Sequence, residues 1–155
     1  MQPDLVVETI TVNESGATVI IKNLGGVPTV GAFWVDLYIN PTETPTLNKT
    51  WDDIGTEGMA WAVTVAINSG ETLTLTTNGT FYQATESQFG TIAPGTPIWV
   101  QVDAVNHNTN YGNVIESDET NNIFGPVSSI TGNAIPEASN RDGENTILNN
   151  LPARR

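Results

Sequence analysis

The chain has 155 residues, which suits one domain, and it contains no cysteine, so a hydrophobic core rather than disulfide bonds has to hold its fold. Its 17 acidic and 5 basic residues give a formal net charge of −12, which repels nucleic-acid phosphates and anionic membrane surfaces. No run of about 18 apolar residues occurs, so the composition argues against nucleic-acid partners and against membrane insertion.

Apolar residues recur with a period of two along most of the chain, which is the pattern of half-buried strands rather than of helices. Gly, Pro, Asn and Asp fill the intervals and indicate turns. The expected strands lie at 4–12, 17–22, 33–40, 61–67, 73–75, 98–104 and 123–127. Seven or eight short strands without helical crossovers predict an all-β fold, an immunoglobulin-like antiparallel β-sandwich.

Two features interrupt this regular pattern. In the first strand the apolar face changes between Val7 and Ile10, which predicts a bulge or a switch of sheet. After the third and clearest strand, residues 40–58 form a long loop with two prolines before the alternation resumes.

The C-terminal part differs from the rest in composition. We expect a sandwich over residues 1–130 and a polar tail, 131–155, outside it, which acts as a strand donor or as a linker. Its stretch 145–148 is the best local strand former, and the edge of a sheet offers unpaired backbone groups to such a strand. The sequence predicts that Ile147, Leu148 and Leu151 dock on an adjacent copy and produce a homopolymer. Packing on the same domain is the open alternative.

Several motifs, in this order and spacing, resemble one family. They are Pro3–Val7, Val19–Asn23, Gly25–Gly26, Phe33–Asn40, Ser69–Leu73, Val102–Asp103 and Glu116–Asn122. Together they are similar to the CARDB family, the cell-adhesion-related domain found in bacteria, over residues 3–128. The resemblance implies an immunoglobulin-like domain embedded in secreted or surface proteins, without a general catalytic activity.

Catalysis has few candidate residues in this sequence. There is no cysteine, His107 is the single histidine, and no Gly-x-Ser-x-Gly motif accompanies it. Carboxylates such as Asp52, Asp53 and Glu57 could in principle serve a glycosidase, but acidic loops are common. We therefore expect that the protein is not an enzyme.

Oxygen-bearing side chains concentrate between residues 103 and 122, and calcium prefers such ligands. Asp103, Glu116 and Glu119 are the first candidates for a calcium site, the one cofactor that the sequence suggests. The alternative is that Asn and Asp side chains here only form turns and bonds to the backbone.

The third and the penultimate strands are neighbours in an immunoglobulin-like sandwich, so Trp34 and Tyr38 would lie beside Trp99 on its outer face. Such an aromatic surface, with Trp51 added, would suit a carbohydrate or a protein partner. The alternative, which we favour, is that residues 40–66 fold over this face as a second small core.

These observations predict a non-enzymatic structural or adhesion module of an extracellular or cell-surface protein, which self-assembles through its tail or contacts neighbouring surface domains. Met1 is followed directly by Gln2, Pro3 and Asp4, so we expect no signal peptide; if the protein is exported, the chain is a mature piece or a segment of a longer chain. The competing hypothesis is a carbohydrate-binding module whose loops are ordered by calcium.

Overall fold

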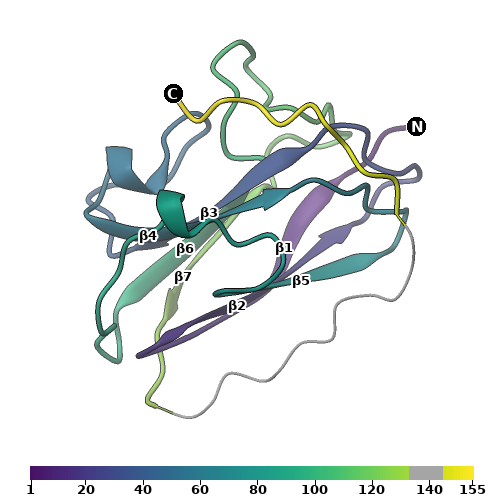
Figure 1. The fold of residues 1–155 in the computed structure, drawn as a ribbon. Coiled ribbons are helices and arrows are strands. Elements are labelled where there is room, and N and C mark those ends of the chain that lie inside the picture. Colours follow the sequence, from purple (N-terminus) through teal and green to yellow (C-terminus); the bar gives the residue numbers. More distant parts are fainter. Residues whose placement is uncertain (133–144) are drawn as a thin grey trace.

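Seven antiparallel strands make up the regular structure of the computed structural model, which describes residues 1–132 and 145–155 (Figure 1). The strands are β1 (Leu5–Asn13), β2 (Gly16–Asn23), β3 (Phe33–Ile39), β4 (Glu57–Val63), β5 (Thr72–Thr76), β6 (Pro97–Val102) and β7 (Ile123–Ser128). Two short 3-10 helices, η1 (Trp51–Asp53) and η2 (Ala84–Glu86), lie in the connections. Within the described ranges, no helix has the length and apolar character needed to cross a membrane.

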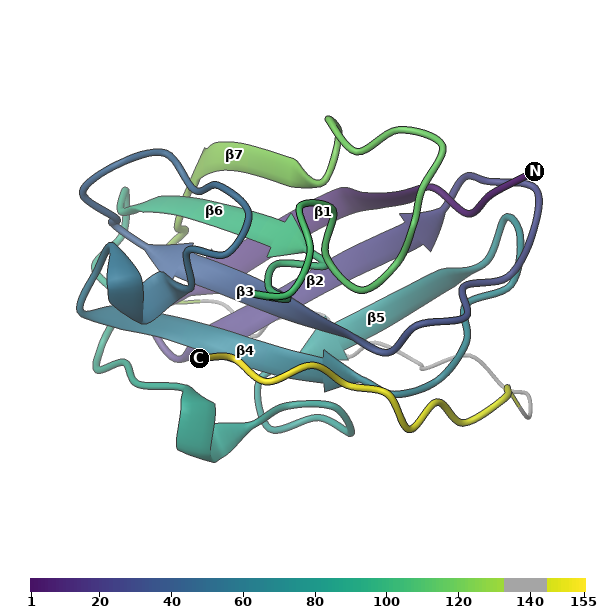
Figure 2. The same cartoon turned by 90° about the horizontal axis from the view of Figure 1, so that it is seen from above.

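The strands form two sheets that pack face to face, as Figure 2 shows from above. One sheet has the order β1-β2-β5 and the other the order β4-β3-β6-β7. This confirms the predicted antiparallel sandwich, and β3 pairs with β6 as expected. The register of β1 shifts between Val7 and Thr9, where the change of apolar face predicts a bulge.

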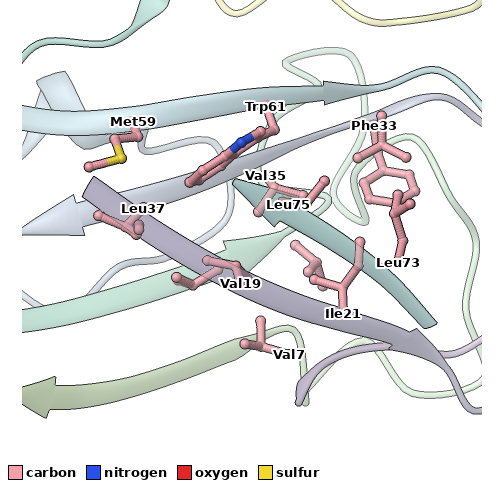
Figure 3. Close-up of a cluster of buried hydrophobic side chains, with 14 of the residues drawn as sticks. Val7, Val19, Ile21, Phe33, Val35, Leu37, Met59, Trp61, Leu73 and Leu75 are labelled. Atoms are coloured by element: carbon pink, nitrogen blue, oxygen red, sulfur yellow. The ribbon is translucent and has the colours of Figure 1, made fainter. Parts of the chain in front are cut away.

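The core lies between the two sheets and is built from the inward residues of each alternating strand (Figure 3). Val19 and Ile21 of β2 face Val35 and Leu37 of β3 across the interface. Trp61 of β4 fills the centre, and its indole N–H donates to the Thr76 carbonyl at 2.9 Å. The polar edge of this ring therefore has a partner, as a buried tryptophan requires.

Strand β3 is buried on both of its faces, because all seven of its residues are shielded from solvent. Its inward residues enter the core, as the alternation predicts. Its outward residues, Trp34, Asp36 and Tyr38, should face water in a two-layer sandwich, yet each is buried. Two irregular segments supply the additional cover.

The first cover is the loop over residues 40–58, the first part of the predicted cover 40–66; the remainder of that range is mostly strand β4 of the sheet itself. Trp51 and Ile54 pack on Tyr38 beside the half-buried Trp99. The Trp51 backbone N–H also donates to Asp36 Oδ2 at 2.9 Å. This loop is therefore a second small core on the outer face of the four-stranded sheet.

The second cover is the C-terminal segment, residues 145–155, which runs along the outer side of β4 and β3 (Figure 2). For these residues the structure shows packing on the same domain, the alternative that the sequence left open, because their polar groups find partners on the sheet. Residues 133–144 of the predicted tail lie outside the described residues.

Gly58 of β4 allows the loop to pack this closely, because a Cβ atom at this position would overlap the Trp51 indole. We expect Gly58→Ala to displace Trp51 and to lower the free energy of unfolding by about 1–3 kcal/mol, measured by chemical denaturation. Gly90→Ala is the matched control, since its Cβ would meet only Glu57 Oε2 at 3.8 Å. Equal effects of the two substitutions would show that the Trp51 contact does not stabilise the fold.

Candidate functional site

The C-terminal segment begins with a single antiparallel bridge beside the edge strand of the four-stranded sheet. Ile147 forms an antiparallel bridge with Val65, just beyond the end of β4. Two backbone hydrogen bonds of 2.7 and 2.8 Å flank this pair, one of them from the Leu148 N–H to the Thr64 carbonyl. The stretch 145–148 thus pairs with a sheet edge, as its sequence predicts, and here the edge belongs to the same chain.

Further along, the segment crosses the outer face and binds through both backbone and side chains. The Trp34 indole N–H donates to the Pro152 carbonyl at 2.7 Å. The Ala32 N–H donates to Asn150 Oδ1 at 2.8 Å. Leu151 packs on the cluster that contains Trp34 and Val105. The half-buried Leu151 is therefore the apolar anchor of the segment.

Arg154 is the centre of the contact. Its two terminal nitrogens donate to the two carboxylate oxygens of Asp36, each at 2.7 Å. The side chains are 5% and 0% exposed, so the ion pair is shielded from water. The guanidinium also lies 4.7 Å from the centre of the Trp34 ring, and its Nε lies 3.4 Å from Glu86 Oε2. Planar, bidentate recognition of a carboxylate is what arginine does and lysine cannot.

The protonation of Arg154 follows from these partners. Burial alone would lower its pKa, but the hydrogen bonds and the charge of Asp36, with a smaller contribution from Glu86, raise the pKa above its ordinary value. The guanidinium is therefore charged throughout the physiological range. Since Asp36 also accepts the Trp51 N–H, one carboxylate connects β3, the 40–58 loop and the C-terminal segment.

The final residue and the single histidine contribute weaker contacts. Arg155, 62% exposed, pairs with Asp52 and lies near Asp53. His107 Nε2 lies 3.0 Å from the Arg154 carbonyl oxygen, which can only accept a hydrogen bond, so this nitrogen carries the hydrogen and donates. His107 thus has a partner on the docked backbone.

The aromatic residues predicted to form a binding surface do come together, but not as an exposed platform. Trp34, Tyr38 and Trp51 are buried, and Trp99 is half-buried. Trp34 contacts the C-terminal segment. Trp51 belongs to the 40–58 loop and packs with Tyr38 and Trp99 of the sheet. The outer face therefore recognises protein segments of its own chain in this structure.

Of the predicted tail residues, Ile147 pairs through its backbone while its side chain stays 70% exposed. Leu148 and Leu151 are half-buried. The sequence reasoning missed Arg154 and Asp36, the most buried contact of the segment. A signal was available: two of the five basic residues of this acidic chain are adjacent at positions 154 and 155.

The predicted calcium ligands have hydrogen-bond partners within the protein. Asp103 accepts the N–H groups of Asn113 and Val114 at 2.8 and 2.9 Å. Glu116 accepts the Leu5 N–H at 2.5 Å and the Asn122 side-chain amide at 2.7 Å. These contacts fold the 103–122 loop onto itself and attach it to β1.

Glu119, the third candidate, accepts the Glu116 N–H at 3.2 Å. In the part of the chain that the structure describes, no group of three or more acidic, histidine or cysteine side chains is arranged to hold a metal ion. Calcium binding by Asp103, Glu116 and Glu119 stays a prediction, and the ion would have to compete with these hydrogen bonds.

Burial changes the acidity of two of these carboxyl groups. It raises the pKa of Asp103 to about 7 and that of Glu116 to about 8, against the opposing effect of the N–H donors. Repulsion from neighbouring carboxylates, Glu119 among them, contributes a smaller part of each rise. Both groups therefore titrate near neutral pH, and protonation lowers the negative charge buried in the loop.

Comparisons with protein-family models, with curated proteins and with solved structures find no match for this chain. The resemblance to the CARDB family therefore stays a prediction that its motifs alone support. The arrangement of strands and the contacts of residues 145–155 are the basis for the functional argument.

Replacing Arg154 should release the C-terminal segment. We expect Arg154→Ala to lower the free energy of unfolding by about 3 kcal/mol, because it leaves Asp36 without its charge partner in a buried position. Arg155→Ala is the matched control, and should cost less than about 1 kcal/mol because Arg155 is exposed. Urea denaturation measures both. A loss no greater for Arg154→Ala than for the control would contradict the assigned role.

The raised acid pKa values predict that the protein becomes less stable as pH rises from about 4 to about 8. In this window the folded chain holds protons on Glu116 and Asp103 that the unfolded chain releases, so raising the pH favours unfolding. Denaturant titrations at several pH values should show a fall on the order of a few kcal/mol that levels off above pH 8. Glu116→Gln should flatten the slope, whereas Glu8→Gln, at an exposed site, should leave it unchanged.

Proposed function

We propose that the protein is a non-enzymatic structural module of an extracellular or cell-surface assembly, which joins copies of itself through the C-terminal segment. One observation carries the proposal: the outer face of β3 is covered by a segment remote in sequence, through the buried Arg154–Asp36 pair. A contact of this kind is specific, because a wrong partner would leave Asp36 buried and unpaired.

Several features support a structural role over catalysis. The single histidine bonds to a backbone carbonyl, and Asp103 and Glu116 bond to backbone N–H groups. Groups held in this way organise the fold. The CARDB-like motifs and the net charge of −12 agree with a soluble module repeated at a cell surface.

The carbohydrate-binding alternative requires an accessible aromatic platform. Trp34, Tyr38 and Trp51 are buried under the chain's own segments, so a sugar would have to displace a packed loop or the Arg154 contact. The observed packing therefore favours a structural module over a sugar-binding one.

Sedimentation velocity over a wide range of concentrations tests the proposal with the full chain. We expect multimers that grow with concentration for the wild type, a loss of multimers for Arg154→Ala and no change for Arg155→Ala. A wild-type protein that stays monomeric throughout would refute self-assembly.

Quenching of tryptophan fluorescence by a panel of oligosaccharides should give a flat response, and saturable quenching would favour the sugar-binding alternative instead.

A further inference from the structure

The first described part of the chain ends, at residue 132, at one end of the sandwich. The second described part begins, at residue 145, at the opposite end. Just before residue 132, the Ile130 N–H donates to the Val12 carbonyl at 2.8 Å, beside the β1–β2 hairpin. The C-terminal segment starts at Asn145, whose side chain donates to the Ala66 carbonyl at 2.7 Å and to Glu71 Oε1 at 2.8 Å. Glu71 lies at the far end of β2, where its backbone carbonyl accepts the Asn23 N–H. In Figure 1 the light-green chain after β7 and the start of the yellow C-terminal segment lie at opposite ends of the sandwich.

Covalent geometry permits the segment to reach this face from either of two molecules. Strand β2 has eight residues, so the two ends of the sandwich are separated by about 23 Å. Twelve residues, 133–144, connect the two parts and can span at most about 43 Å. That length is enough for residue 145 to reach its docking site on the same sandwich, or on an adjacent sandwich in end-to-end contact. The contacts of residues 145–155 described above can therefore also form with a second copy.

The end where the segment begins also exposes apolar side chains. Leu24, Val30 and Ile115 are each more than half exposed there, in the loops that surround the start of β1. The opposite end exposes Ile130, next to the point where the sandwich ends. Contact between unlike ends would shield both sets from water, and exposed apolar groups of this kind mark interaction surfaces.

From these observations we propose that residues 145–155 are exchanged between copies: the segment of one molecule docks on the outer face of β3 and β4 of the next, with Arg154 bound to the neighbour's Asp36. This rests on the proposed function and names its partner as a second copy of this chain. The exchange of an identical element adds no new chemistry, because each lost internal contact is replaced by the same contact between molecules.

The geometry also sets the type of assembly. Each chain would leave its sandwich at the Ile130 end and dock at the other end of its neighbour, so the contact joins two different surfaces. A contact between unlike surfaces that does not close on itself continues from copy to copy and builds a filament. Reciprocal exchange between only two molecules would instead give a closed dimer.

Engineered cysteines can detect the exchange directly, because the natural chain has none. Val65 and Ile147 form a bridge whose backbone hydrogen bonds flank the pair, the arrangement in which opposing side chains are closest. We would prepare full-length Val65→Cys and Ile147→Cys proteins separately, mix them at high concentration and oxidise them. A disulfide-linked heterodimer on a non-reducing gel is expected, because a 65–147 bond in this mixture can only join two molecules.

The variant with both substitutions separates the types of assembly. Head-to-tail exchange gives a ladder of covalent multimers, and a product that stops at the dimer would overturn the filament. A monomer with an internal disulfide, together with mixed single variants that stay monomeric, would overturn the exchange itself. Val65→Cys mixed with Glu8→Cys, at an exposed site on the other sheet, controls for random oxidation and should give no dimer above background.

The same samples distinguish this inference from the proposed function. Multimers in sedimentation without a 65–147 bond between molecules would mean that the copies assemble but do not exchange the segment. If neither multimers nor intermolecular bonds form, self-assembly fails as well. Adding Arg154→Ala to the Ile147→Cys protein should reduce the heterodimer yield several-fold, whereas adding Arg155→Ala should not.

Discussion

The ion pair between Asp36 and Arg154 is the contact on which the outer half of the molecule depends. A carboxylate in the middle of a buried strand is costly unless charge and hydrogen bonds compensate for the lost water. Arg154 supplies two charge-assisted bonds and the Trp51 backbone N–H supplies a third. Because one carboxylate receives all of them, the 40–58 loop and the C-terminal segment are held in place by the same group.

This constraint changes the character of the sheet. An antiparallel sandwich usually packs one face of each sheet and leaves the other in water. Here both faces of β3 are covered, and the aromatic row that could have been an open binding surface is a docking surface for peptide segments. The surface recognises backbone through the Trp34 indole, apolar shape through the cluster around Leu151, and charge through Asp36. Such a combination suits the specific joining of protein chains.

A second group of buried acids shapes the loop between β6 and β7. Asp103 and Glu116 turn their carboxyl groups inward to backbone N–H groups, and these hydrogen bonds fix the loop. Burial makes the ionised form of each carboxyl group less favourable, so the pKa values of Asp103 and Glu116 are both raised. The same oxygen-rich composition that suggests calcium is here satisfied by the protein's own donors.

The antiparallel sandwich can be predicted from the sequence alone, because a period of two, turn residues at the intervals and a change of face at Val7 are local properties of the chain. The sequence also indicated that the stretch 145–148 pairs with a sheet edge, where Ile147 forms a bridge, and that the chain after β3 folds back over the aromatic row. The side chain that holds the C-terminal segment, Arg154 on Asp36, is evident only from the tertiary structure. Asp36 and Arg154 are 118 residues apart, and no local pattern distinguishes a charge that will be buried and paired from one that stays in water. That choice depends on which faces meet, which periodicity cannot encode.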